Sequence, residues 1–159
     1  MTRIAITGHR GLPPATVTLV EEALRSELRR YAGGDLVGLS CLADGADRLF
    51  AQAVLDVGGA LEAIIPAEGY RVKVAPESPP AYDTLLARAA SVVQLDHPRP
   101  NSEAYMHASE EMLKRADVVF AVWDGQPPRA WGGTADVVVE ARKEGLPVVV
   151  IWPEGSTRD

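Results

Sequence analysis

Short apolar runs alternate with longer amphipathic stretches along the 159 residues of the chain. The apolar runs are nearly continuous, which is typical of strands buried on both faces of a parallel sheet. The amphipathic stretches carry apolar residues at helical spacing, as Val17, Val20, Leu24 and Leu28 do. The pattern predicts strands over residues 4–6, 36–39, 61–65, 91–95, 118–123 and 148–152, and helices over residues 15–31, 45–57, 81–90, 102–115 and 134–144.

Strands and helices that alternate in this way predict an α/β fold. We expect residues 1–159 to form a single domain with one doubly wound, mostly parallel, Rossmann-like sheet and helices on both faces. Right-handed crossovers favour a central first strand, and ligands of such sheets bind at the carboxyl ends of the strands. Residues 67–80 are rich in turn formers and fit no single element, and Pro66 is expected to end the third strand.

Composition narrows the classes of function. The formal charge is −6, and the 16 basic residues are scattered, which argues against binding of extended nucleic acid or of a membrane surface. The sequence shows neither a signal peptide nor an apolar run of membrane-spanning length, so we expect a cytoplasmic protein. The single Cys41 is expected to be a small buried apolar residue, and the three histidines lack the spacing of metal ligands.

The first strand is followed by Thr7, Gly8, His9 and Arg10, the first of three loops expected at the ligand-binding edge. Gly8 would let the backbone approach a ligand, and Arg10 would clamp a phosphate or carboxylate unless it is only a surface residue. His9 is expected to hold a loop through hydrogen bonds. The Gly-x-Gly-x-x-Gly fingerprint of dinucleotide-binding folds is missing here, which counts against a dehydrogenase, and we expect no cofactor.

The second loop runs from Ser40 through Asp44 and Gly45 to Asp47. Its small residues would let backbone amides face a ligand. The two aspartates stand at the start of a predicted helix, where carboxylates satisfy free amides and interact with the helix dipole. A role in capping the helix is therefore the favoured interpretation for both, and contact with a ribose hydroxyl is the functional alternative.

The third loop, Gly132, Gly133 and Thr134, opens the last predicted helix and is the strongest candidate for phosphate binding, because glycines, a hydroxyl and a helix N-terminus together form an anion site. A plain turn with Thr134 as the N-cap is the structural alternative. The preceding segment, with Asp124, Gly125 and Arg129, would form a lid. Arg129 would then reach a second phosphate, or else remain a solvated loop residue.

Several short motifs resemble the SLOG superfamily of Rossmann-like nucleotide-ligand-binding domains. The segment from Ser40 to Asp47 is similar to a Ser-Gly-Leu-Ala-x-Gly-x-Asp motif of its DNA-processing protein A branch. Thr7 to Arg10 is similar to the opening segment of YpsA-like members. Tyr105-Met106-His107 and Gly132-Gly133-Thr134 resemble segments of the LOG branch. The resemblance implies a Rossmann-like domain that binds a nucleotide-derived ligand.

Three functions follow from these patterns. The preferred one is binding or sensing of a nucleotide or a nucleotide-derived phosphorylated ligand. The second is a LOG-like phosphoribohydrolase that cleaves the N-glycosidic bond of a nucleoside monophosphate. The catalytic Glu of that branch falls at Val137 here, so Asp136 or Asp44 would have to replace it. The third is a structural or partner-binding subunit, in which apolar helix faces would form a homodimer.

Overall fold

The computed structural model describes residues 1–31, 34–75, 79–127 and 133–158. Six parallel strands form one sheet in the order β4-β3-β2-β1-β5-β6, which confirms the expected fold class and the central first strand. The chain leaves β1 toward β2 on one side and later returns to β5 on the other, so the topological switch point lies between β1 and β5. The strands are β1 (Thr2–Gly8), β2 (Leu36–Ser40), β3 (Ala60–Ala67), β4 (Ser91–His97), β5 (Val118–Val122) and β6 (Val148–Val150).

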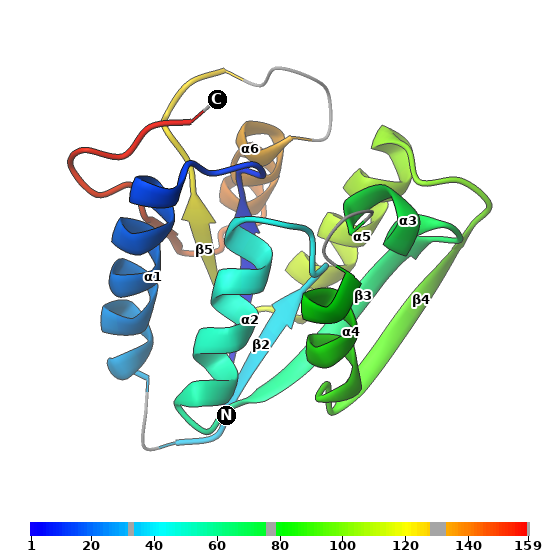
Figure 1. Cartoon of the computed structure of the whole chain (residues 1–159), viewed down its shortest axis with the longest axis horizontal. Coiled ribbons are helices and arrows are strands. Elements are labelled where there is room, and N and C mark those ends of the chain that lie inside the picture. The colour runs from blue at the N-terminus through cyan, green and yellow to red at the C-terminus, as the bar shows by residue number, and fades with distance from the viewer. Residues whose placement is uncertain (32–33, 76–78, 128–132, 159) are drawn as a thin grey trace.

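Helices cover both faces of the sheet (Figure 1). The helices are α1 (Pro14–Arg29), α2 (Ala46–Asp56), α3 (Tyr70–Val74), α4 (Pro79–Ala87), α5 (Ser102–Arg115) and α6 (Thr134–Lys143). A Cβ on Gly38 would lie within 3 Å of Phe50 and Val54, so α2 packs directly on β2. Helix α1 lies beside α2, and α4 contacts α2 on the same face, whereas α5 and α6 contact β1 from the opposite face.

Two details of the third strand and its connection differ from the expectation. Strand β3 continues through Pro66, and its register with β4 shifts between Ile65 and Ala67. A proline is tolerated in a strand at such an irregularity because no ladder hydrogen bond from its nitrogen is required there. The turn-rich stretch after β3 contains the short helix α3 and the first two residues of α4, which the sequence pattern left unassigned.

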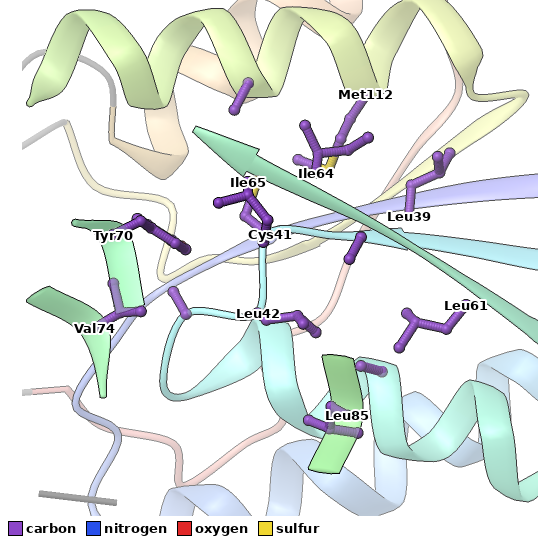
Figure 2. Packing of buried hydrophobic residues seen from close by; sticks show 14 of the residues in the cluster. Leu39, Cys41, Leu42, Leu61, Ile64, Ile65, Tyr70, Val74, Leu85 and Met112 are labelled. Carbon is purple, nitrogen blue, oxygen red and sulfur yellow. The ribbon is translucent and has the colours of Figure 1, made fainter. Parts of the chain in front are cut away.

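The buried apolar residues of the described chain form three clusters, which cover both faces of the sheet. On the face of α1 and α2, the rings of Phe50 and Phe120 meet edge to face with centroids 6.0 Å apart. In the neighbouring cluster, Met112 reaches from α5 toward Ile64, while Leu61 and Leu85 lie on the other side of the strands (Figure 2). Burial on both sides explains why the inner strands β2, β1 and β5 are largely apolar, whereas β4 at the edge of the sheet is mostly exposed and carries polar residues.

The edge of the sheet where the strands begin is closed by an ion-pair network. The carboxylate of Glu62 on β3 accepts hydrogen bonds from Arg3 at 2.7 Å and from Arg115 at the end of α5. The Arg3 Nε also donates to the carbonyl oxygen of Arg115 over 2.7 Å. This network accounts for a buried glutamate inside a strand and leaves the opposite edge of the sheet for the site described next.

Candidate functional site

A cavity of about 360 Å³ lies at the carboxyl ends of the strands. This volume is within the usual range for small-molecule sites, and the position agrees with the rule for open parallel sheets. Residues of all three predicted loops reach the cavity, together with α3, α5 and the segment after β6. Its described walls include Thr7, Gly8, His9, Arg10, Cys41, Ala43, Asp47, Pro66, Tyr70, Val74, Ser102, Tyr105, Ser109, Met112, Trp123, Gln126, Pro127, Gly133, Thr134 and Arg158.

Gly8 ends β1 where α2 and β5 approach most closely. A Cβ at this position would meet the Cβ of Ala46 and lie 2.9 Å from the Cβ of Val122. A residue without a side chain is therefore required here for α2 and β5 to pack against β1. The sequence suggested approach of a ligand as the reason for this glycine. The structure adds a packing reason, while Gly8 also forms part of the cavity wall.

His9 is buried and holds the loop after β5. The backbone N–H of Asp124 donates to His9 Nε2 over 3.1 Å, and an Arg158 guanidinium nitrogen lies 3.3 Å from the same atom. The Asp124 carboxylate also lies 3.2 Å from Nε2, a contact that becomes an ion pair only with a protonated ring. The ring packs edge-on against Trp152.

Arg10 and Asp44 join the first loop to the second. The Arg10 Nε donates to Asp44 Oδ1 over 2.7 Å, and the N–H of Gly11 donates to Oδ2 over 3.2 Å. Arg10 lines the cavity, whereas Asp44 is absent from the described part of its wall. Asp44 therefore orients the arginine that the sequence singled out without itself lining the described part of the cavity.

The second loop is held by its own hydrogen bonds. The Ser40 hydroxyl donates to the carbonyl oxygen of Asp47 and accepts from the N–H of Leu42. Leu42 has a φ of 59°, a left-handed conformation that is strained for a leucine. Gly45 has a φ of 85°, and a Cβ there would lie 2.6 Å from the His9 carbonyl oxygen. Gly45 therefore allows the close contact between the first two loops.

Asp47 is the carboxyl group that the second loop contributes to the cavity wall. Its Oδ2 accepts a hydrogen bond from the Ala43 N–H over 3.3 Å, which agrees with the expected role of satisfying amides at the start of α2. Burial raises its pKa to about 7, because desolvation penalises the ionised form more strongly than the Ala43 hydrogen bond and the nearby arginines favour it. The site therefore contains a carboxyl group that is partly protonated near neutral pH.

The third loop places the N-terminus of α6 in the cavity wall. Gly133 is the N-cap residue and makes no side-chain capping bond, so Thr134 is the first residue of the helix rather than its cap. Gly133 and Thr134 both line the cavity, while Asp136 is half-buried and is absent from its described wall. The predicted contributions of Arg129 and Gly132 lie outside the described residues.

The segment after β5 covers the cavity beside this helix. The Trp123 indole N–H donates to the carbonyl oxygen of Gln126, and the Gln126 N–H donates to Asp124 Oδ1. Gly125 turns with a φ of 80°, and Gln126 and Pro127 line the cavity. Burial opposes ionisation of Asp124, but the Gln126 hydrogen bond and the neighbouring His9 and Arg158 lower its pKa below the ordinary value. Of the segment expected to form a lid, Gln126 and Pro127 line the cavity, whereas Asp124 and Gly125 are absent from its described wall.

The sequence did not single out the aromatic wall or the arginine near the end of the chain. Tyr70 comes from α3, which the pattern left unassigned, and Tyr105 was noted only within a family motif. The Tyr105 hydroxyl is buried without a hydrogen-bond partner. Arg158 follows the last strand and gives no sequence signal of its own, because its position depends on the path of the chain after β6.

Neither a cluster of metal ligands nor a membrane-spanning helix occurs among the described residues. Within residues 1–31, 34–75, 79–127 and 133–158, no three histidine, cysteine, aspartate or glutamate side chains cluster as a metal site. His97 and His107 form a pair, with ring nitrogens 2.7 Å apart, between the end of β4 and α5. None of the described helices is long and apolar enough to cross a membrane.

Known structures share this arrangement of strands and helices. The chain superimposes on DNA processing protein A from Streptococcus pneumoniae with a TM-score of 0.67 and 19% identity, over 94% of this chain and 50% of that one. The protein of the same name from Helicobacter pylori, described for its single-stranded DNA binding mode, gives a TM-score of 0.69 and 16% identity, over 99% of this chain and 68% of that one. The chain therefore shares the Rossmann-like α/β fold of these proteins.

A third match is the molybdenum cofactor carrier protein of Chlamydomonas reinhardtii, with a TM-score of 0.56 and 18% identity, over 94% of this chain and 75% of that one. The chain spans half the length of the Streptococcus pneumoniae protein. The sequence matches no family model and no curated protein. At these identities the comparisons establish the fold of the chain and do not identify its ligand.

Proposed function

We propose that the chain binds a nucleotide or a nucleotide-derived phosphorylated ligand in the cavity at the carboxyl edge of its sheet. The observation that carries this proposal is a cavity wall that combines two chemically different sets of side chains. We assign Gly133, Thr134 and two arginines to a phosphate end of the cavity, and Tyr70, Tyr105, Met112 and Val74 to a base end. A phosphate and an aromatic base require these two environments.

The phosphate end is formed beside β5. The first turn of a helix presents unpaired backbone N–H groups and the positive end of the helix dipole, both of which favour an anion. Thr134 adds a hydroxyl donor, and Gly133 brings no side chain that would keep a phosphate away. Arg10, oriented by Asp44, supplies a positive charge from the neighbouring loop.

The base end is formed beside β2 and β3. Tyr70 and Tyr105 meet edge to face with ring centroids 5.9 Å apart, and Met112 and Val74 extend this apolar wall. Three strand spacings separate β3 from β5, which is about 14 Å at the usual spacing of about 4.8 Å. An extended nucleotide spans a distance of this order. Asp47 lies on the second loop, where it would accept a hydrogen bond from the sugar or from a base N–H.

Thermal unfolding with a panel of ligands tests the proposal. The panel consists of adenosine, guanosine, cytidine and uridine monophosphates, their nucleosides and a single-stranded oligonucleotide. At least one monophosphate should raise the melting temperature of the wild-type protein by several degrees, and its nucleoside should raise it less. The proposal fails if no monophosphate or phosphosugar shifts the transition, and stabilisation by the oligonucleotide alone would favour nucleic-acid binding instead.

A pair of variants locates the phosphate. Thr134→Asp places a carboxylate in the first turn of α6, where it interacts favourably with the helix dipole and repels a phosphate. Val139→Asp adds the same charge to an exposed position of the same helix. We expect Thr134→Asp to abolish the ligand-induced shift without lowering the melting temperature of the free protein, and Val139→Asp to retain the shift.

The buried carboxyl of Asp47 supports a second candidate, cleavage of the N-glycosidic bond of a nucleoside monophosphate. An oxocarbenium-like transition state needs a nearby carboxyl group, and Asp47 lies in the cavity wall, unlike Asp44 and Asp136 in the described wall. Chromatography of free base after incubation with monophosphates separates an enzyme from a binding protein. Release of base by the wild type that is lost in Asp47→Asn would support catalysis, and the absence of release excludes it.

A further inference from the structure

The segment that follows β6 returns across the carboxyl edge of the sheet (Figure 1). It is attached to α1 by two hydrogen bonds with one buried side chain. The Thr157 N–H donates to Thr16 Oγ1 and the Thr16 hydroxyl donates to the Thr157 carbonyl oxygen, both over 2.9 Å. Gly155, with a φ of 90°, turns the segment beside Leu19. This attachment fixes the direction in which the next residue, Arg158, extends.

Arg158 is an incompletely satisfied cation in the wall of the cavity. Its side chain is only 21% exposed, and its Nε is buried without a hydrogen-bond partner. One Nη lies 3.3 Å from His9 Nε2 and 3.7 Å from Asp124 Oδ2. A contact of 3.7 Å is too long for a hydrogen bond, so Asp124 forms an ion pair with the guanidinium but does not satisfy its N–H groups.

Leaving a guanidinium in this state costs free energy, because a desolvated charge and an unpaired N–H group are both unfavourable. A planar guanidinium presents its N–H groups as a fork that matches two oxygens of a phosphate or carboxylate. An oxyanion in the cavity would supply the missing acceptors. The N-terminus of α6, which also favours an anion, lines the same cavity.

We propose that Arg158 binds the oxyanion of the ligand together with the N-terminus of α6, and that residues 153–158 form a strap that holds this arginine in the site. This inference rests on the proposed function, since it specifies which residues hold the phosphate. It adds that the ligand bears an anionic group with at least two free oxygens. Thr16 is a positioning residue, because it acts through Thr157 on Arg158.

The alternative is that Arg158 serves only to neutralise Asp124 and to stabilise the fold. The two roles predict opposite results for the free protein. A structural arginine lowers the melting temperature when it is replaced by glutamine. A ligand-binding arginine that is unsatisfied without its ligand does not, and its replacement instead weakens binding.

The test compares Arg158→Gln with Arg30→Gln, which removes a 75% exposed arginine at the end of α1. Calorimetric titrations use the monophosphate selected by the thermal panel, its nucleoside and inorganic phosphate. We expect Arg158→Gln to weaken monophosphate binding about tenfold or more, to leave nucleoside binding unchanged, and to leave the melting temperature of the free protein unchanged or higher. Arg30→Gln should bind like the wild type.

Two further variants keep the test decisive if Arg158→Gln is poorly folded. Arg158→Lys keeps the charge without the fork, and we expect intermediate affinity. Thr16→Val removes both hydrogen bonds to Thr157 and should weaken monophosphate binding in the same direction, whereas Thr16→Ser should restore it.

The outcomes separate this inference from the proposed function. Equal monophosphate affinity in wild type and in Arg158→Gln overturns the role of Arg158 while the proposed function stands. Binding of inorganic phosphate that depends on Arg158, with no nucleotide bound by the wild type, supports the role of Arg158 and overturns the nucleotide proposal. If the wild type binds neither phosphate nor nucleotide at millimolar concentration, both fail.

Discussion

The Nε of Arg10 lies 2.7 Å from Oδ1 of Asp44, and this ion pair ties the loop after β1 to the loop after β2. The two side chains are 45% and 35% exposed, so the pair contributes at most about 1 kcal/mol to the free energy of unfolding. Its larger effect is on geometry, because it directs a cavity-lining arginine. The shape of the site around Arg10 therefore depends on the loop after β2 as well as on the loop after β1.

Replacing Asp44 should therefore affect binding more than stability. We expect Asp44→Asn to change the free energy of unfolding by no more than about 1 kcal/mol and to weaken binding of the monophosphate several-fold. Urea unfolding and calorimetric titration of the same preparation measure the two quantities. A large loss of stability with unchanged affinity would show that the pair is needed for folding and not for the site.

Gly8→Ala should destabilise the fold through overpacking. The added methyl group would collide with Ala46 and Val122, so α2 or β5 would have to move to make room for it. We expect the free energy of unfolding to fall by about 1–3 kcal/mol, measured by urea denaturation. Gly34→Ala is the matched control, because a Cβ on Gly34 meets nothing within 4 Å. Equal stability of the two variants would refute the packing role of Gly8.

The buried carboxyl of Asp47 should make stability depend on pH. Its pKa is raised from 3.8 to about 7 in the folded state, so the folded protein holds a proton that the unfolded chain releases. Stability therefore falls as the pH rises from about 4 to about 7, by a contribution of order 4 kcal/mol, and levels off above that range.

Asp47→Asn removes this contribution while keeping a side-chain oxygen that accepts from the Ala43 N–H. We expect the stability of Asp47→Asn relative to the wild type to increase between pH 4 and pH 8, as measured by urea unfolding at both pH values. A difference between the two proteins that does not change with pH would contradict the raised pKa.

Cys41 should be unreactive in the folded protein. Its thiol is 8% exposed, and burial together with the nearby Asp47 raises its pKa, which suppresses the reactive thiolate. We expect a disulfide reagent to label the native protein at pH 8 far more slowly than the urea-unfolded chain. Immediate labelling of the native protein would show that the cavity exposes the sulfur more than its burial indicates.

The order of elements and the class of fold could be predicted because apolar runs and helical periodicity are local properties of the sequence. Pro66 was misleading, since a proline ends a strand only where the neighbouring strand needs an N–H donor at that position, and the irregular pairing with β4 removes that need. Helix α3 has five residues, which is too short for a periodic pattern.

The candidate site was predictable to the extent that a fold rule places loops. The sheet brings Thr7 and Thr134 to one cavity. Thr7 is near the end of β1, Thr134 begins the helix that follows β5, and these two strands are parallel neighbours. The relation of Arg10 to Asp44 depends on side-chain positions across 34 residues, and that of Arg158 to His9 spans 149. Contacts at such separations depend on the folded path of the chain and leave no local pattern.

A crystal structure of the protein grown with the monophosphate that stabilises it tests the central claim most directly. The account predicts a phosphate within hydrogen-bond distance of the Thr134 N–H and of the Arg158 guanidinium, with the base against Tyr70 and Tyr105. A nucleotide bound elsewhere on the molecule, or a cavity that contains only water at a saturating concentration, would contradict it.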